Sequence, residues 1–361
     1  MAGPKVLILI GTNKGAFILE SDAGREDWSI RGPYCDHWPI HHVVGDPATG
    51  AIYAGGGNRW TGAAVWKSSD LGGTWDHSGD GIAYGEGEEP VKSVWSLAPA
   101  HGRLWAGVEP AGLFVSDDGG ASFSHVTGLT EHPSRPTWQS GGGGMILHSL
   151  LADPADPEKL WVGISVAGVF ASEDGGRSWS PRNRGTRCEF GPGEASYPEH
   201  GQCVHSLVRG SGPDARLFQQ NHCGMYVSDD GGRDWTSVED GLPSSFGFPA
   251  AAHPHDPDTF YLVPLNGDVD GRYMPDAAAA VWRTRDAGRS WQDLRTGLPQ
   301  QNAYLCVLRQ ALAVDTLPVP GVYFGTNSGT LFASRDEGET WTEIARHLPM
   351  ILSVETMVVG D

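Results

Sequence analysis

Short apolar segments alternate with polar turns along the whole chain, and each segment is too short to be a typical helix. The clearest unit covers residues 204–238, where four such segments follow one another at 204–208, 216–220, 224–227 and 235–238. Gly, Asp and Ser separate these segments, which is typical of antiparallel strands joined by tight turns. We name the four strands A, B, C and D in chain order. The pattern predicts an all-β protein built from four-stranded sheets.

A short motif occupies the expected turn between strands C and D and recurs along the chain. Its form is close to Ser/Thr-x-Asp-x-Gly-x-Ser/Thr-Trp/Phe, with six well-formed copies and one degraded copy near the N-terminus. Successive motif aspartates are 48 to 56 residues apart and stand at Asp22, Asp70, Asp118, Asp174, Asp230, Asp286 and Asp336. A repeat of this length with four short strands indicates a radial β-propeller. Seven repeats use the whole chain, so we expect one seven-bladed domain over residues 1–361.

The two ends of the chain predict how the ring closes. The first repeat has candidates for strands B, C and D, but nothing before residue 5 resembles a strand A. The last segment, 351–360, has the strand A pattern and no further strands after it. We therefore expect this C-terminal strand to complete the first blade, residues 5–31. Such closure removes an exposed sheet edge.

The repeated turn motif resembles the Asp box, which is also called the BNR repeat. This motif is found in sialidases, in xyloglucan-active glycoside hydrolases, in sortilin-type receptors and in the photosystem II assembly factor. The resemblance implies a propeller whose motif aspartates stabilise turns and take no part in catalysis. It does not select a function, because those relatives include enzymes, receptors and scaffolds.

Charge and composition exclude several classes of partner. The chain has 44 acidic and 25 basic side chains and a net charge of −19, which would repel nucleic acid. It has no long apolar run or basic amphipathic stretch, so we expect no membrane contact. Without a recognisable signal peptide, the expected location is the cytoplasm. A closed ring needs no partner to fold, so we expect a monomer.

Three histidines occupy equivalent places at the starts of A strands. In a propeller the A strands line the central channel, and the D–A and B–C loops surround one of its mouths. His41 and His148 each precede an Asp-Pro pair by five residues, and His205 aligns with them. Imidazoles that converge from rigid strands suit Zn, Mn, Fe or Cu. We expect these three histidines to bind a divalent transition metal; the alternative is that they line the channel through hydrogen bonds.

Polar residues of the B–C loops are candidates for catalysis at the same mouth. Glu109, His222 and Tyr273 are candidate acids or bases, and Arg59 adds a cation. Long D–A loops and an insertion at 264–280 also fall on this face, as is typical of functional surfaces. The favoured hypothesis is a metal-centred lyase or hydrolase that acts on a small polar or carbohydrate-like substrate.

Two other function classes remain open. The first is a metal-free glycoside hydrolase that pairs Glu109 with Glu86 or Asp268, since such enzymes use two carboxylates. The second is a non-enzymatic interaction or assembly scaffold. Separately, Asp268 and Asp270 resemble the first half of a calcium loop, but the closing glutamate is missing.

Overall fold

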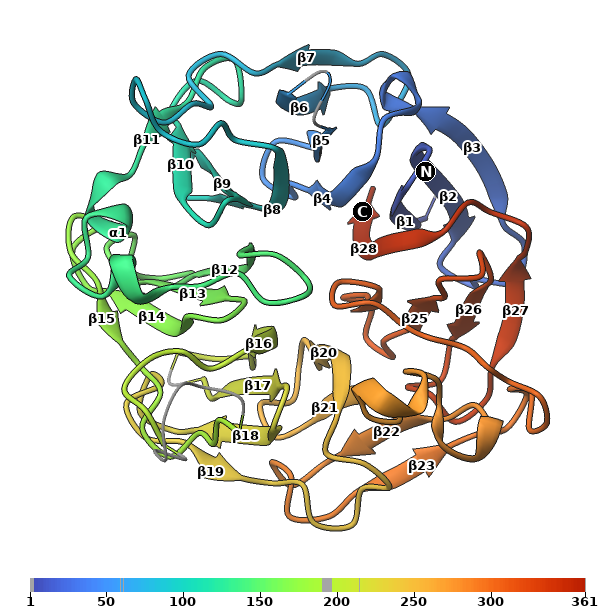
Figure 1. Ribbon diagram of the computed structural model, residues 1–361. Helices are drawn as coiled ribbons and strands as arrows, with labels where there is room; N and C mark the ends of the chain where they lie inside the picture. Colours follow the sequence, from blue (N-terminus) through green and yellow to red (C-terminus); the bar gives the residue numbers. More distant parts are fainter. Residues whose placement is uncertain (1–2, 59, 61, 190–196, 214, 361) are drawn as a thin grey trace.

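Seven antiparallel four-stranded sheets form a ring in the computed structural model, which describes residues 3–360 except 59, 61, 190–196, 214 and the side chain of Asp268. The first strand of each blade lies nearest the central channel and the last lies at the rim (Figure 1). Blade 1 comprises β28 (Ile351–Val359), β1 (Lys5–Thr12), β2 (Gly15–Asp22) and β3 (Ser29–Tyr34), and blade 2 comprises β4 (Ile40–Gly45), β5 (Ile52–Asn58), β6 (Gly62–Ser68) and β7 (Asp76–Ser78). Blade 3 comprises β8 (Ser93–Ala100), β9 (Arg103–Glu109), β10 (Leu113–Ser116) and β11 (Ser124–His125), and blade 4 comprises β12 (Leu147–Ala152), β13 (Leu160–Ile164), β14 (Gly168–Ser172) and β15 (Ser180–Pro181). Blade 5 comprises β16 (Val204–Arg209), β17 (Leu217–Asn221), β18 (Gly224–Ser228) and β19 (Thr236–Ser237), and blade 6 comprises β20 (Gly247–Ala252), β21 (Phe260–Pro264), β22 (Val281–Thr284) and β23 (Gln292–Leu294). Blade 7 comprises β24 (Leu312–Val314), β25 (Val322–Gly325), β26 (Leu331–Ser334) and β27 (Thr342–Ala345). The predicted seven-bladed all-β propeller is therefore confirmed.

The C-terminal strand closes the first blade as predicted. β28 pairs antiparallel with β1 along its whole length, from Lys5 opposite Val359 to Thr12 opposite Ile351. Both strands are apolar on the faces that pack against neighbouring blades, and Val6, Ile8 and Val354 are fully buried. The two termini consequently lie side by side near the channel (Figure 1).

Each well-formed Asp box occupies the turn between the third and fourth strands of its blade, and the first copy shows how it works. The Asp70 carboxylate accepts hydrogen bonds from the backbone N–H and the hydroxyl of Thr74 and from the Ser68 hydroxyl, at 2.8–2.9 Å. These bonds hold the pKa of Asp70 down at about 2, with the Thr74 backbone contributing most. Gly72 has φ +90°, a conformation that favours glycine. These aspartates are engaged within their turns.

One strand assignment from the sequence is wrong. The apolar run 305–308 by itself predicts strand A of the last blade, but that strand is β24, and residues 303–308 are not in a strand. Val307 is fully buried, which explains the strand-like apolar pattern. Backbone carbonyls of residues 305–310 instead accept hydrogen bonds from three separate parts of the chain. The Leu305 carbonyl accepts from Met274 N–H, the Cys306 carbonyl from Asn327 N–H, and the Gln310 carbonyl from Val354 N–H. Residues 303–310 therefore form a loop at the channel mouth.

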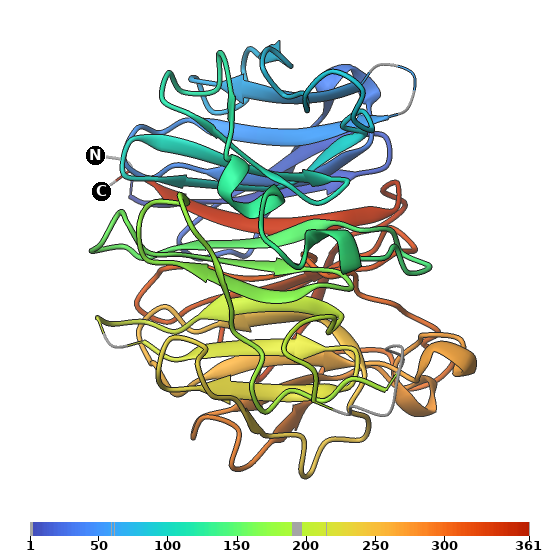
Figure 2. The same ribbon diagram turned by 60° about the vertical axis from the view of Figure 1, so that its left-hand side comes forward.

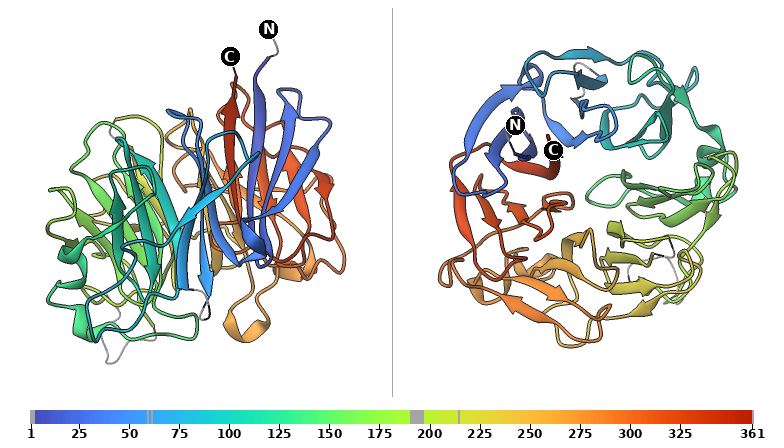
Figure 3. Two further views of the ribbon diagram at one scale, coloured as in Figure 1. Left: turned by 90° about the horizontal axis from the view of Figure 1, so that it is seen from above. Right: turned by 180° about the vertical axis from the view of Figure 1, so that it is seen from behind.

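The loop-bearing face and the terminal face are opposite each other. The insertion after β21 protrudes from one face, while both termini leave the other, in two independent views (Figures 2 and 3). The helical segments are short: α1 (Thr127–Thr130), η1 (Cys35–His37), η2 (Arg135–Thr137), η3 (Asp268–Asp270) and η4 (Pro275–Ala277). Among the described residues, no helix has the length and apolar character needed to span a bilayer.

Candidate functional site

A cavity of about 430 Å³ lies on the loop-bearing face, between blades 4, 5, 6 and 7. Its described lining consists of Gly141, Gly142, Gly143, Gly144, Ser165, Val166, Cys203, His205, His222, Phe248, Arg272 and Arg309. These residues come from D–A loops, B–C loops and the starts of inner strands, where the sequence predicted that a site should be sought. Three side chains that offer metal ligands and two guanidinium groups meet there.

The three predicted histidine positions are structurally equivalent. The pairing of each inner strand with its neighbour shifts register around His41, His148 and His205, so each histidine sits in a β-bulge. A bulge leaves one residue unpaired and redirects its side chain. In this ring the redirected side chains reach the next blade. The sequence therefore predicts correctly that the three histidines occupy equivalent positions. Because these positions are spread around a ring, however, each side chain meets different neighbours.

Contacts with the next blade separate His41 and His148 from His205. The His41 ring stacks on Trp95, with centroids 3.9 Å apart. Both ring nitrogens of His148 are engaged: Nε2 lies 2.7 Å from the carbonyl oxygen of Val204, and Nδ1 lies 3.1 Å from Oγ of Ser149. These three histidines do not assemble the predicted ligand set, because two of them serve as packing and hydrogen-bonding groups between blades.

A different group can hold a metal ion. Within the described residues, Cys203, His205 and His222 are the one set of three whose potential ligand atoms all lie within 4.8 Å of one another. Cys203 directly precedes the inner strand of blade 5, His205 is the second residue of that strand, and His222 follows the second strand of the same blade. Cys203 is a thiol and takes no part in a disulfide. His205 and His222, predicted as ligand and as acid or base, are thus brought together.

The His205 ring is oriented for a ligand role. Its Nδ1 lies 2.6 Å from the carbonyl oxygen of Gly247, and a carbonyl only accepts, so Nδ1 carries the proton and Nε2 keeps a lone pair. Burial holds the pKa of His205 well below its usual value, and the nearby Arg309 cation acts in the same direction. Metal-binding histidines commonly donate their second N–H to a backbone carbonyl in this way. The neutral ring therefore offers Nε2 to the group.

The other predicted catalytic residues lie beside the cavity or outside the described chain. The Glu109 carboxylate accepts a 3.1 Å hydrogen bond from Trp95 Nε1 and lies 3.8 Å from Nζ of Lys92. The Tyr273 ring packs edge-on against Tyr304, with centroids 5.1 Å apart, next to the lining residue Arg272. Arg59 is outside the described residues, as is the Asp268 side chain.

Sequence reasoning missed Cys203 as a candidate ligand and Arg309 as a lining residue. Arg309 was overlooked because residues 305–308 were assigned to a strand, which left Arg309 at that strand's end. One sequence pattern does indicate Cys203: it stands two residues before His205, at the start of a strand that lines the channel.

The half-buried His41 makes stability depend on pH. Burial lowers its pKa to about 4, so between pH 6.5 and 4 the unfolded chain binds a proton that the folded chain does not. The free energy of unfolding therefore falls as the pH decreases through this window. We expect His41→Phe, which keeps a ring against Trp95, to reduce the loss of stability between pH 7 and pH 5 by about 2 kcal/mol. Urea unfolding at both pH values measures this, and equal losses in both proteins would contradict it.

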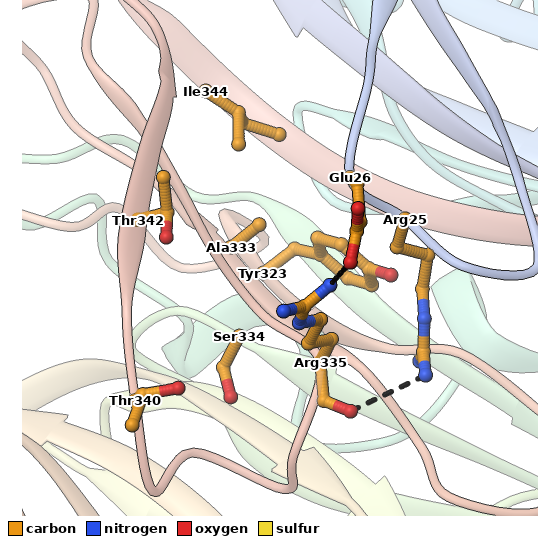
Figure 4. A pocket seen from close by; sticks show the side chains of 9 residues that line it. All are labelled: Arg25, Glu26, Tyr323, Ala333, Ser334, Arg335, Thr340, Thr342 and Ile344. Carbon is orange, nitrogen blue, oxygen red and sulfur yellow. Dashed lines mark hydrogen bonds and ion pairs between the residues drawn. The ribbon is translucent and has the colours of Figure 1, made fainter.

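A second cavity, of about 300 Å³, has a structural role. It lies between blades 7 and 1 and is lined by Arg25, Glu26, Tyr323, Ala333, Ser334, Arg335, Thr340, Thr342 and Ile344 (Figure 4). Arg335 forms an ion pair with Glu26, and Arg25 donates to the backbone carbonyl of Arg335. Arg25 also forms an ion pair with the buried Asp315. These pairs join the last blade to the first.

Curated relatives match part of this chain. No protein-family model matches it. An oligoxyloglucan-reducing end-specific xyloglucanase of Emericella nidulans is 23% identical in an alignment over 227 residues that covers 53% of this chain and 25% of that protein. The match thus covers about a quarter of the relative's length.

Solved structures share the fold. The GH74 xyloglucanase from Xanthomonas campestris aligns with a TM-score of 0.65 at 19% identity, over 96% of this chain and 55% of that chain. The periplasmic gluconolactonase of Pseudomonas aeruginosa aligns with a TM-score of 0.59 at 14% identity, over 98% and 99%. YCF48 from Cyanidioschyzon merolae gives 0.51 at 16% identity, over 84% of each chain. The chain is a seven-bladed β-propeller of the Asp-box repeat type.

Proposed function

We propose that the protein is a hydrolase that acts on a carbohydrate-like substrate in the cavity of blades 4 to 7, at a metal centre held by Cys203, His205 and His222. The observation that carries this proposal is the convergence of three potential ligand atoms within 4.8 Å at the mouth of the channel. The similarity to xyloglucanases supports hydrolysis of a carbohydrate-like substrate. The ligand set replaces the one expected from the sequence.

The chemistry of the three residues fits a transition metal. One thiolate and two imidazoles are ligands that zinc and copper accept, and three protein ligands leave a position for water or substrate. The Arg309 guanidinium interacts with Cys203 beside the group, and the thiolate is the form of cysteine that binds metals. When bound, such a metal supplies a Lewis acid and an activated water.

The residues around the group bind and orient a substrate. The exposed Tyr304 ring and the adjacent Tyr273 ring stand beside Arg272 and offer an apolar surface on which a sugar ring can stack. Phe248 forms part of the cavity wall. In this proposal Tyr273 contributes to substrate binding, and the phenol is not needed as an acid or base.

The paired-carboxylate mechanism has less support. The described lining of the cavity contains no Asp or Glu, and a glycosidase of that kind needs two carboxylates that flank the bond. Glu109 is engaged by Trp95 and Lys92. A metal-centred hydrolase therefore explains the lining better.

Wild-type protein purified without chelator and without an affinity tag tests the proposal. We expect elemental analysis to find about one equivalent of zinc, copper, manganese or iron. Hydrolysis of aryl glycosides or sugar lactones should disappear after dialysis against a chelator and return when the metal is added. Protein that contains no metal, or activity that chelation leaves intact, would contradict the metal centre.

A further inference from the structure

Arg309 places a cation in the wall of the cavity. Its guanidinium lies over the Phe248 ring, 5.0 Å from the centroid, and its Nε has no hydrogen-bond partner. Among the described residues no carboxylate pairs with it, whereas most other described arginines form ion pairs with Asp or Glu. Arg309 is therefore a cation without a carboxylate partner among the described residues.

A second guanidinium approaches the same ring. The Arg272 guanidinium is 5.9 Å from the centroid of Phe248, so two like charges share one aromatic surface. Two like charges in one partly buried hollow repel each other and lose hydration, and an anion that binds beside them lowers this cost in free energy. Because the whole chain has a net charge of −19, this pair of positive side chains is a local feature of the cavity.

The backbone holds Arg309 in this position. The neighbouring Gln310 donates from its side chain to the His148 carbonyl, 3.0 Å away across the channel mouth. The Gln310 carbonyl accepts a 2.8 Å bond from Val354 N–H on β28. On the other side, a Cβ at Gly143 would lie 3.6 Å from Nη2 of Arg309, so the glycine loop 141–144 borders the guanidinium. The cation is thus preorganised next to Cys203, His205 and His222.

We infer that the cavity recognises an oxyanion, a carboxylate or a phosphate, on its substrate through Arg309 and Arg272. A planar guanidinium matches the oxygen pairs of both groups, and charge-assisted bonds to it are strong. The substrate class is then an acidic carbohydrate-like molecule, such as a sugar acid or a sugar phosphate. This inference rests on the proposed function for the reaction, but anion binding itself requires no metal.

Calorimetric titration of the whole protein with three probes tests the inference. The probes are glucuronate, glucose 6-phosphate and glucose, each titrated into metal-loaded and chelator-treated protein. We expect one or both anionic probes to bind at least about ten-fold more tightly than glucose, and the preferred probe identifies carboxylate or phosphate. Equal affinities for all three probes, or no binding of any, would overturn the inference.

Three arginine variants show whether the cavity is responsible. Arg309→Gln and Arg272→Gln should each weaken the anionic probe by about ten-fold or more. Arg177→Gln is the matched control, because Arg177 is exposed in an Asp-box turn and pairs with Glu158 at the surface. It should bind like the wild type. Equal weakening in the control would mean that net charge alone explains binding.

Thermal unfolding without ligand separates recognition from a structural role. Removal of a buried cation that has no carboxylate partner should leave the Arg309→Gln midpoint unchanged or raised. A lowered midpoint together with normal binding by Arg272→Gln would overturn the inference. Metal analysis of the same samples distinguishes the two proposals: bound metal without anion preference refutes only anion recognition, and anion preference without metal refutes only the metal centre.

Discussion

Replacing His205 with alanine is expected to remove the bound metal, from about one equivalent to less than about a tenth of one. His205 is the most buried member of the group, and its Nδ1 bond to the Gly247 carbonyl fixes Nε2 as the ligand atom. Loss of one of three protein ligands should lower metal affinity at least about 100-fold. Elemental analysis after gel filtration measures the metal. Any hydrolase activity should fall in parallel.

Two further variants make this result specific. His222→Ala removes a less buried ligand from the same group, so it tests the site with less risk to folding. His148→Asn is the matched control, because His148 contacts Val204 and Ser149 and lies outside the group. We expect His222→Ala to lose metal and His148→Asn to keep it. The reverse pattern would restore the ligand set predicted from the sequence.

Replacing Asp315 with asparagine is expected to reduce the free energy of unfolding by about 3–5 kcal/mol. The Asp315 carboxylate is fully buried and accepts bonds from Arg25 at 2.9 Å and from the Tyr323 hydroxyl at 2.7 Å. Arg25 belongs to blade 1 and Tyr323 to blade 7, so the substitution leaves a buried cation unpaired where the ring closes. Urea unfolding at pH 7 gives the loss.

A surface pair beside this network provides the comparison. Glu26→Gln breaks the exposed pair with Arg335, and we expect it to cost less than about 1 kcal/mol. The double variant Arg25→Leu with Asp315→Leu should recover much of the loss, because it removes both buried charges. An Asp315→Asn cost no larger than that of Glu26→Gln would show that the buried pair does not hold the blades together.

The sequence alone determined the architecture of the ring. The Asp boxes contain their own hydrogen-bonding groups, such as Asp70, Ser68 and Thr74, so the turn can be recognised from residues close in the chain. The strand period is also local, and the unmatched segment at 351–360 predicted the closure that β28 makes with β1. The loop-bearing face followed from the strand order, and the cavity lies there.

Only the tertiary structure decided which side chains meet. His41, His148 and His205 occupy equivalent bulges, yet each side chain turns towards the next blade and finds a different neighbour there. The loop 303–310 has the apolar pattern of a strand because Val307 is buried, and its real path brings Arg309 to Phe248. The composition of a site therefore depends on contacts between blades far apart in sequence, whereas the blades themselves depend on local pattern.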